Sequence, residues 1–234
     1  MTMKQVVEVQ GDVLRDKVYF HLCELIRGGH FSPGEKLTIR SLANEQGISP
    51  TPVREALYRL ISEGVLDGEA NRSARIPLLN AEQIKEIKEI RILVECLAAE
   101  KAAMNGTPQL AKTLRALAGK LKMARASGDR RADLSLVYRF QTELYSACEM
   151  PNLIKIIGSL WLKTGPYLNL LFPDYINLIA KSRGDWRERI CVGVEERNPA
   201  IVRSEVERDL DDTLSYIANV VSAAAFLRRA GADR

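Results

Sequence analysis

Apolar residues in the first 77 positions repeat at helical spacing in three short segments, which turn residues separate. The third segment has an apolar face that predicts a buried side of a helix: Val53, Ala56, Leu57, Leu60 and Ile61. The opposite face carries residues that can meet a partner: Thr51, Arg54, Tyr58 and Ser62. Thr38 and Ser49 are suited to cap the second and third helices, and Gly47 is suited to end the second. The pattern predicts a helix-turn-helix.

Segments on either side extend this motif to a winged helix-turn-helix over residues 1–77. A preceding helix that closes at residues 28–29 has an apolar stripe: Leu14, Val18, Leu22, Leu25 and Ile26. Pro33 and Gly34 suit a type II turn, because Pro fixes φ at its second position and Gly supplies a positive φ at its third. Residues 65–66 and 75–76 are predicted strands around a tip at residues 67–74.

Residues 78–234 form the second predicted domain, in which helix follows helix and no run of alternating strand residues appears. Asn80 and Gln83 form a predicted capping box at its start, and the first two helices end near residues 105–106 and 127–129. The remaining predicted helices are 133–149, one that starts at residue 151, 174–197 and 199–227. The fold class is therefore mainly α: an N-terminal winged helix-turn-helix and a C-terminal all-α bundle of six or seven helices.

Composition limits the kind of protein only weakly. No apolar run approaches the roughly 20 residues of a membrane span, and the N-terminus lacks an apolar signal core, so we expect a cytoplasmic chain with no membrane partner. Four widely spaced cysteines are expected to be buried thiols.

The net charge is +4, yet residues 1–77 hold ten Lys/Arg and ten Asp/Glu. Affinity for a polyanion would therefore need a local patch of arginines, for which the candidates are Arg40, Arg54, Arg72 and Arg75.

The first domain closely resembles the DNA-binding domain of the GntR family of bacterial transcription factors. The matching elements are residues 33–37 (PGEKL), 51–57 (TPVREAL) and the Leu60, Glu63, Gly64 ending. The resemblance implies that double-stranded operator DNA is a partner and that these residues face it: Arg40, Thr51, Arg54 and Arg72. Ser49 can donate to a phosphate at the helix N-terminus.

Two departures from the family pattern affect sequence recognition. The family usually has Ser-Arg-Thr-Pro where this chain has Ser49-Pro50-Thr51-Pro52, so a base-reading arginine is replaced by a residue without a donor. The wing tip usually carries Arg-Gly, whereas Ser73 follows Arg72 here. DNA binding is still expected, but not the operator sequence of relatives.

The second domain resembles the FCD ligand-binding domain of FadR-like GntR regulators, through Ile90-Arg91-x-x-Val94-Glu95, Phe140, the turn at 150–153 and the helix pair around Asn198. Many FCD domains bind a divalent metal through one Asp and three His. The matching positions here hold Val137, Gln141, Arg187 and Asp209, and the only two histidines, His21 and His30, lie in the first domain. This is a poor set of ligands for a transition metal, so we expect neither a metal nor another cofactor.

The vacated metal position has two interpretations. Arg187 and Asp209 are each 11 residues from Asn198, so an antiparallel helix pair can bring them to one level, either as a structural ion pair or with Arg187 binding an anionic effector. Arg91, the family's pocket arginine, can face the same anion or pair with Glu95 one turn away. The candidate ligand-binding residues are Arg91, Val137, Gln141, Asn152, Arg187 and Asp209.

The predicted function is a homodimeric transcriptional regulator, a repressor by family resemblance, with a small anionic metabolite as effector. An organic acid is the first choice. An acyl-CoA effector, or a dimer without any effector, stays open. An enzyme is not predicted, because P-loop, GxGxxG and GxSxG motifs are missing, and Asp133, Glu143 and Glu149 are interpreted as surface carboxylates.

Overall fold

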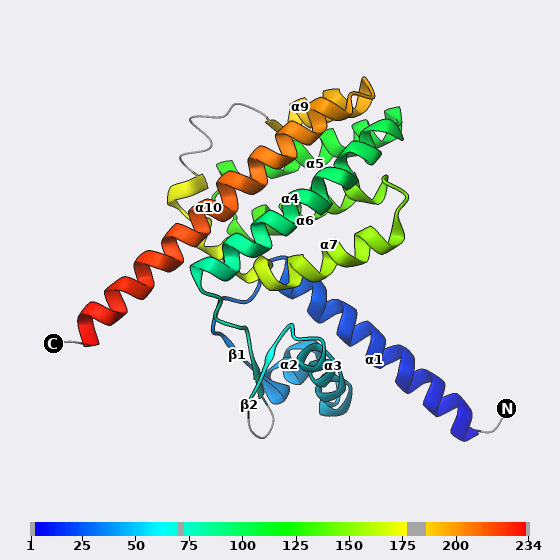
Figure 1. Ribbon diagram of the computed structural model, residues 1–234. Coiled ribbons are helices and arrows are strands. Elements are labelled where there is room, and N and C mark those ends of the chain that lie inside the picture. The colour runs from blue at the N-terminus through cyan, green and yellow to red at the C-terminus, as the bar shows by residue number, and fades with distance from the viewer. Residues whose placement is uncertain (1–2, 70–72, 177–185, 233–234) are drawn as a thin grey trace.

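The computed structural model describes residues 3–69, 73–176 and 186–232. Buried residues form two hydrophobic clusters, one in the N-terminal part of the chain and one in the helical part (Figure 1). The predicted boundary between residues 77 and 78 falls in the segment that joins the last strand to the first helix of the second part. Among the described residues, no helix is both long and apolar enough to cross a membrane.

The N-terminal part is the predicted winged helix-turn-helix. It comprises α1 (Met3–Arg27), β1 (Lys36–Thr38), α2 (Ile39–Gln46), α3 (Pro50–Ser62), β2 (Asp67–Glu69) and β3 (Ser73–Arg75). Residues along α1, α2 and α3 bury one shared core, which confirms the apolar face predicted for α3 except that Ile61 is half-buried. Leu14 is exposed, so the predicted α1 stripe was wrong at its first residue.

The wing differs from the predicted pair of strands. β3 lies between β1 and β2 in an antiparallel sheet, and β1 was not predicted. Val65 and Leu66 are buried between α3 and the sheet, so pairing starts at Asp67, two residues nearer the tip than predicted. Strand pairing depends on hydrogen bonds between backbone groups, so strand β2 can contain the charged residues Asp67 and Glu69 while the apolar Val65 and Leu66 fill the core. The wing tip residue Arg72 lies outside the described residues.

The turn chemistry agrees with the sequence. Gly34 has φ 77°, and the Glu35 amide donates to the Ser32 carbonyl over 3.0 Å, as a type II turn at Pro33-Gly34 requires. The Thr38 hydroxyl accepts from the Ser41 amide at 3.1 Å, and Gly47 ends α2 with φ 64°. Ser49 occupies the N-cap position of α3, but its side chain makes no capping hydrogen bond within the described part of the chain.

The C-terminal part is helical, as predicted. It contains α4 (Ala81–Met104), α5 (Pro108–Ala126), α6 (Arg130–Ser146), α7 (Pro151–Thr164), a 3-10 helix η1 (Gly165–Leu171), α9 (Trp186–Glu195) and α10 (Pro199–Ala232). The capping box is confirmed, since the Asn80 and Gln83 side chains each accept from the other's amide at 2.9 Å. Helix α6 starts at residue 130 instead of 133, because Asp129 caps it through the Ala132 amide. Most of the predicted helix 174–197 before α9 lies outside the described residues.

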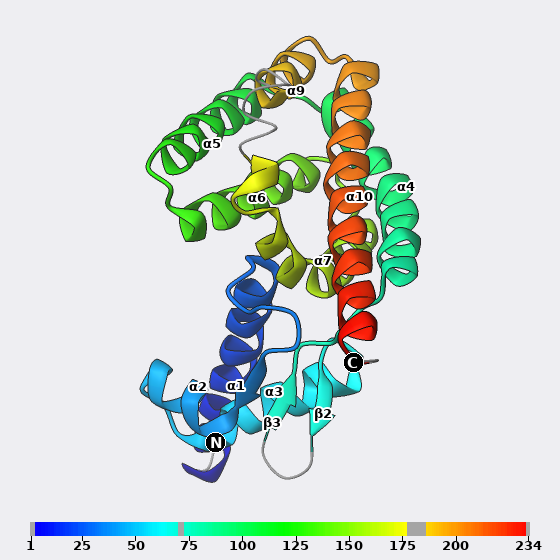
Figure 2. The same ribbon diagram turned by 90° about the vertical axis from the view of Figure 1, so that its left-hand side faces the viewer.

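Helix α4 packs along α10, and together they form the spine of this part (Figures 1 and 2). Four buried alanines on α4 allow close packing: Ala98, Ala99, Ala102 and Ala103. Two apolar residues of α4 lie outside this core, since Val94 is half-buried and Leu97 is exposed. Arg91 and Glu95 are buried instead. The four cysteines are buried free thiols, as predicted.

Candidate DNA-binding surface and effector pocket

The exposed face of α3 presents the residues that the sequence assigned to DNA. Thr51, Arg54 and Tyr58 are exposed there, Arg40 is exposed at the start of α2, and Ser49 is exposed at the N-terminal end of α3. Helix α3 is held from behind by α1, where the Tyr19 hydroxyl donates to the Glu63 carboxylate over 2.6 Å. A short, firmly seated helix with a polar N-terminal end fits the dimensions of a major groove.

Arg75 has a structural role in the wing. It is half-buried, and its guanidinium donates to the Gly34 carbonyl over 2.6 Å. This hydrogen bond ties β3 to the turn before β1. Arg75 therefore stabilises the wing, and its contact with DNA stays a prediction.

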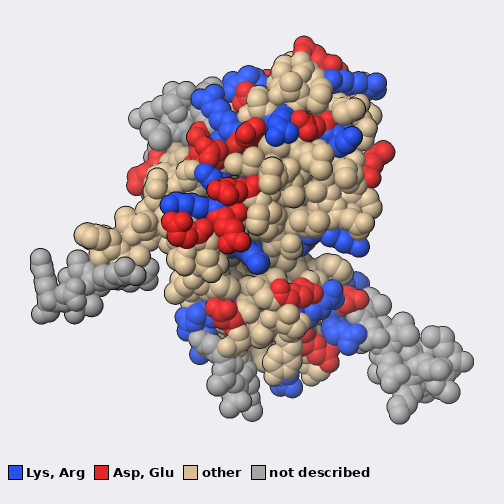
Figure 3. Space-filling view, viewed as in Figure 1, with Lys and Arg blue, Asp and Glu red and all other residues tan. Residues whose placement is uncertain are grey.

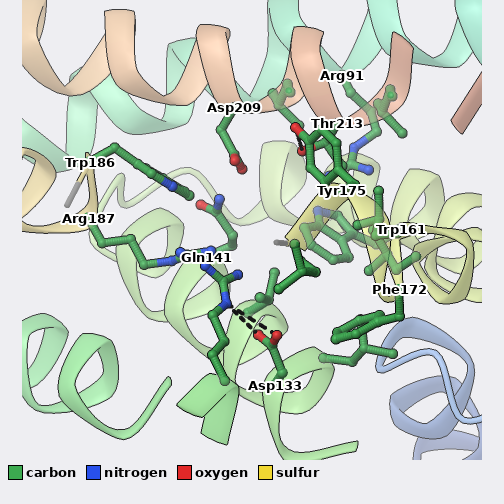
Figure 4. Close-up of a pocket in the computed structure, with 18 residues that line it drawn as sticks. Arg91, Asp133, Gln141, Trp161, Phe172, Tyr175, Trp186, Arg187, Asp209 and Thr213 are labelled. Atoms are coloured by element: carbon green, nitrogen blue, oxygen red, sulfur yellow. Dashed lines mark hydrogen bonds and ion pairs between the residues drawn. The ribbon is translucent and has the colours of Figure 1, made fainter. Parts of the chain in front are cut away.

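A pocket lies in the middle of the C-terminal part, between helices that all contribute side chains to its wall (Figure 4). Val137 and Gln141 reach it from α6, Arg187 from α9 and Asp209 from α10. The four positions matched to the family's metal ligands thus converge on one place, although no metal fits them. Valine offers no donor atom and arginine repels a cation. Among the described residues, no group of three His, Cys, Asp or Glu side chains could hold a metal ion.

Arg91 adopts the second of its two predicted roles. Its guanidinium donates to Glu95 Oε1 at 2.5 Å and Oε2 at 3.3 Å, and to Thr164 Oγ1 at 2.9 Å. It also stacks on Trp161, with the guanidinium carbon 4.3 Å from the ring centroid. Arg91 is 2% exposed and Glu95 0%. Arg91 still borders the pocket, but its charge is balanced by Glu95.

A second ion pair, between a half-buried Arg125 and a buried Asp133, was missed by the sequence interpretation. Both oxygens of Asp133 lie 3.2 Å from Arg125 Nε, and both residues line the pocket. Asp133 is 1% exposed, so its interpretation as a surface carboxylate was wrong. A signal existed in the chain, because Arg125 is in the last turn of α5 and Asp133 in the first turn of α6, and the short turn between them brings the two together.

Gln141 and Arg187 occupy the centre of the pocket beside aromatic rings. The guanidinium carbon of Arg187 lies 4.1 Å from the Trp186 ring centroid and 5.8 Å from that of Phe140. Gln141 Oε1 is buried and has no hydrogen-bond partner among the described residues.

Burial raises the pKa of the nearby Tyr145 phenol well above its usual value, and the charge of Glu95 raises it further, so this hydroxyl stays protonated.

Asn152 does not belong to the pocket. It is exposed in the first turn of α7, where the following residue, Leu153, faces the core. Its prediction as a ligand-binding residue was therefore wrong.

The open volume of the pocket is about 40 Å³, which is room for about two or three water molecules.

Residues 158–172 form one wall of the pocket and also seat the N-terminal part of the chain. Trp161, Leu168 and Leu171 line the pocket, whereas Leu162 packs into the N-terminal core. On that second side, Arg27 Nε donates to the Gly158 carbonyl at 3.0 Å. The Asn169 amide nitrogen lies within hydrogen-bond distance of the carbonyls of Gly29 (2.8 Å) and Phe31 (3.1 Å).

At Gly165 the start of η1 lies directly against the backbone at the end of α1. A Cβ built there would lie 2.6 Å from the carbonyl oxygens of both Ile26 and Arg27. Only glycine lets the end of α1 approach the start of η1 this closely. The end of α1 sits under α7 and η1 in Figure 2. We refer to Arg27, Gly158, Leu162, Gly165 and Asn169, with the loop at 28–31, as the domain junction.

Comparison with known proteins gives two family matches. Residues 14–76 match the family described as bacterial regulatory proteins, gntR family, and residues 86–211 match the FCD domain. The HTH-type transcriptional regulator McbR of Escherichia coli (strain K12) is 35% identical over 144 residues, which span 62% of this chain and 65% of McbR. The sequence match therefore covers slightly less than two thirds of that relative.

One solved structure supports the same assignment, and a second shares the fold. The structure described as E. coli McbR/YncC superposes with a TM-score of 0.76 at 28% identity, over 88% of this chain and 97% of that one. A GntR regulator from Rhodococcus sp. RHA1 shares the fold, with a TM-score of 0.65 at 20% identity over 88% and 97% of the two chains.

Proposed function

Because the chain belongs to the GntR family of bacterial transcriptional regulators and carries an FCD domain, we propose that it is a homodimeric repressor whose C-terminal domain binds a small carboxylate effector without a metal. GntR regulators bind DNA, and FCD domains bind small-molecule effectors. The observation that carries the DNA-binding role is the exposed N-terminal end of α3 with Thr51 and Arg54, together with the exposed Arg40 at the start of α2. We also expect Arg72 and Ser49 to contact the phosphate backbone.

Replacing Arg54 with alanine should weaken operator binding at least tenfold. Arg54 is exposed near the N-terminal end of α3, so truncation removes a charged donor to DNA without opening a cavity in the core. A gel-shift titration on the operator, run with circular dichroism to verify folding, measures the loss.

Arg139→Ala is the matched control, since Arg139 is an exposed arginine on α6 and its loss changes the net charge equally. It should leave operator affinity within about twofold, because the charge lies far from the DNA-facing helix. Equal affinities for the two variants would remove Arg54 from the DNA-reading surface.

The proposed dimer uses an exposed apolar face on α4 and α7. The two helices run antiparallel, since Asn105 at the end of α4 donates to Ala147 just before α7, and Arg91 bonds Thr164 at the end of α7. Exposed apolar residues from both helices form this face: Ile90, Leu93, Leu97, Met104, Met150 and Ile156. Figure 3 shows it as an uncharged area next to the charged residues along α10. Contiguous exposed apolar surface of this kind marks an interface.

A second copy is the partner that fits this face. Glu86 and Glu89 are exposed on α4, and Lys155 and Lys163 are exposed on α7. A two-fold axis can set the lysines of one protomer against the glutamates of the other, as a self-complementary contact requires. The pair of α3 helices could then enter successive major grooves of a near-palindromic operator, about 34 Å apart.

Leu93→Asp should convert the dimer to a monomer, because a carboxylate would be desolvated at the centre of the apolar contact. Met123→Asp is the matched control: the two side chains are 68% and 67% exposed, but Met123 lies on α5. Native mass spectrometry reports the subunit number and any bound metal or solute in one spectrum. A dimeric Leu93→Asp protein would rule out this face as the interface.

Effector binding can reach DNA through the domain junction. The effector would contact one side of residues 158–172, and the N-terminal domain rests on the other side. A ligand that binds two placements of this segment with different affinity would change the placement of α3, and the size of the response is set by that difference.

The small open volume of the pocket favours one alternative, a regulator with no effector, and disfavours an acyl-CoA. Against the effector-free reading stands Gln141, a buried acceptor that a solidly packed structural core would be expected to satisfy.

A further inference from the structure

The charges in the pocket wall balance one another almost completely. Arg91 faces Glu95 and Arg125 faces Asp133, so a carboxylate offsets each of these two arginines. Arg187 and Asp209 add one charge of each sign to the same wall. A purely anionic ligand would be attracted by Arg187 but repelled by Asp209 at short range. A ligand that carries both signs matches this wall better.

Gln141 adds a requirement for a hydrogen-bond donor. Its side chain is 3% exposed, and Oε1 has no partner among the described residues. In Figure 4 its amide lies between Arg187 and Asp209 and points into the pocket. A buried acceptor without a donor is unfavourable, and a ligand N–H or O–H would satisfy it. A simple carboxylate supplies only acceptors.

We propose that the effector is a small zwitterion with an α-amino acid head group. Its carboxylate contacts Arg187, and its ammonium group donates to Gln141 Oε1 and to the Asp209 carboxylate. This inference rests on the proposed effector-binding function and names the ligand class for that pocket. The open volume of about 40 Å³ restricts the ligand to a small molecule that displaces the few waters the pocket can hold.

The test is calorimetric titration of the full-length protein with the standard L-amino acids. Each amino acid that binds is compared with its desamino analogue, which keeps the carboxylate and the side chain. The amino acid should bind at least tenfold more tightly than the desamino analogue, because loss of the donor leaves Gln141 unsatisfied.

Three other outcomes separate this inference from the proposed function. Equal binding of amino and desamino compounds overturns the zwitterion and leaves a carboxylate effector in place. If succinate, citrate or lactate binds and no amino acid binds, the zwitterion is also overturned and a carboxylate effector stays in place. If neither the amino acids nor these acids bind, both the ligand class and the carboxylate pocket are wrong. Operator binding is tested independently by the Arg54→Ala experiment.

Variants assign the roles within the pocket. Gln141→Leu and Asp209→Asn should each reduce the preference for the amino acid over its desamino analogue at least fivefold. Asp211→Asn is the control, since Asp211 lies on the same helix at the surface beside Lys88. A purely structural role for Gln141 would lower stability and leave the ratio of the two affinities unchanged, which would overturn its assignment.

Discussion

Glu95→Ala is expected to destabilise the protein by about 3–5 kcal/mol, because it leaves Arg91 charged, buried and without its carboxylate. Arg91 is held between Glu95, Thr164 and the Trp161 ring, so its guanidinium cannot move to solvent without disturbing α7. For a domain of this size the loss corresponds to a fall in Tm on the order of 10 °C. Differential scanning calorimetry or urea unfolding measures it.

Glu196→Ala is the control for this experiment. Glu196 is an exposed glutamate in the turn between α9 and α10, so its removal should change the free energy of unfolding by less than about 0.5 kcal/mol. The double variant Arg91→Met, Glu95→Leu should regain part of the stability, since it removes both charges and keeps the volume. If Glu95→Ala and Glu196→Ala proved equally stable, the pair would not be a buried structural tie.

Gly165→Ala is expected to open the domain junction. The new Cβ would meet two backbone carbonyl oxygens at 2.6 Å, and backbone atoms cannot rotate aside as a side chain can. Overpacking of this kind typically costs about 1–3 kcal/mol. Amide hydrogen exchange should accelerate in residues 26–31 while the cores of both domains stay protected.

The same variant tests the proposed route from pocket to DNA. Operator affinity should change in Gly165→Ala, and an effector found by titration should shift that affinity less than in the parent protein. Gly119→Ala is the matched control: apart from its chain neighbours and the backbone of its own helix, no described atom lies within 4 Å of a Cβ built there, and alanine is the better helix former in α5. Unchanged exchange at residues 26–31 in Gly165→Ala would mean that the contact at Gly165 does not hold the domains together.

The pocket shows where a family resemblance stops being informative. Matching the metal positions onto Val137, Gln141, Arg187 and Asp209 located four residues that do line one pocket. The same resemblance gave no sign that Arg125 and Asp133 complete the wall, and the sequence left open whether Arg91 faces a ligand or pairs with Glu95. Those pairings set the charge of the pocket, so they change the expected ligand from a plain anion to a zwitterion.

Features governed by neighbouring residues could be derived from the sequence alone. Thr38, Gly47 and the Asn80–Gln83 pair act at the helix ends predicted for them, because caps and turns depend on residues within four positions. The apolar repeats likewise gave α3 and the helical character of the second domain, since a repeat of 3.6 residues is a local property.

Only the tertiary structure decided the features that depend on distant contacts. The spacing of Arg91 and Glu95 allowed them to pair, but their burial depends on α7 and α10, which pack against α4. Gly165 and Asn169 carry no sequence signal for the domain junction, because their partners are more than 130 residues away. The volume and charge balance of the pocket arise where several helices meet, and no local pattern encodes how closely their side chains pack.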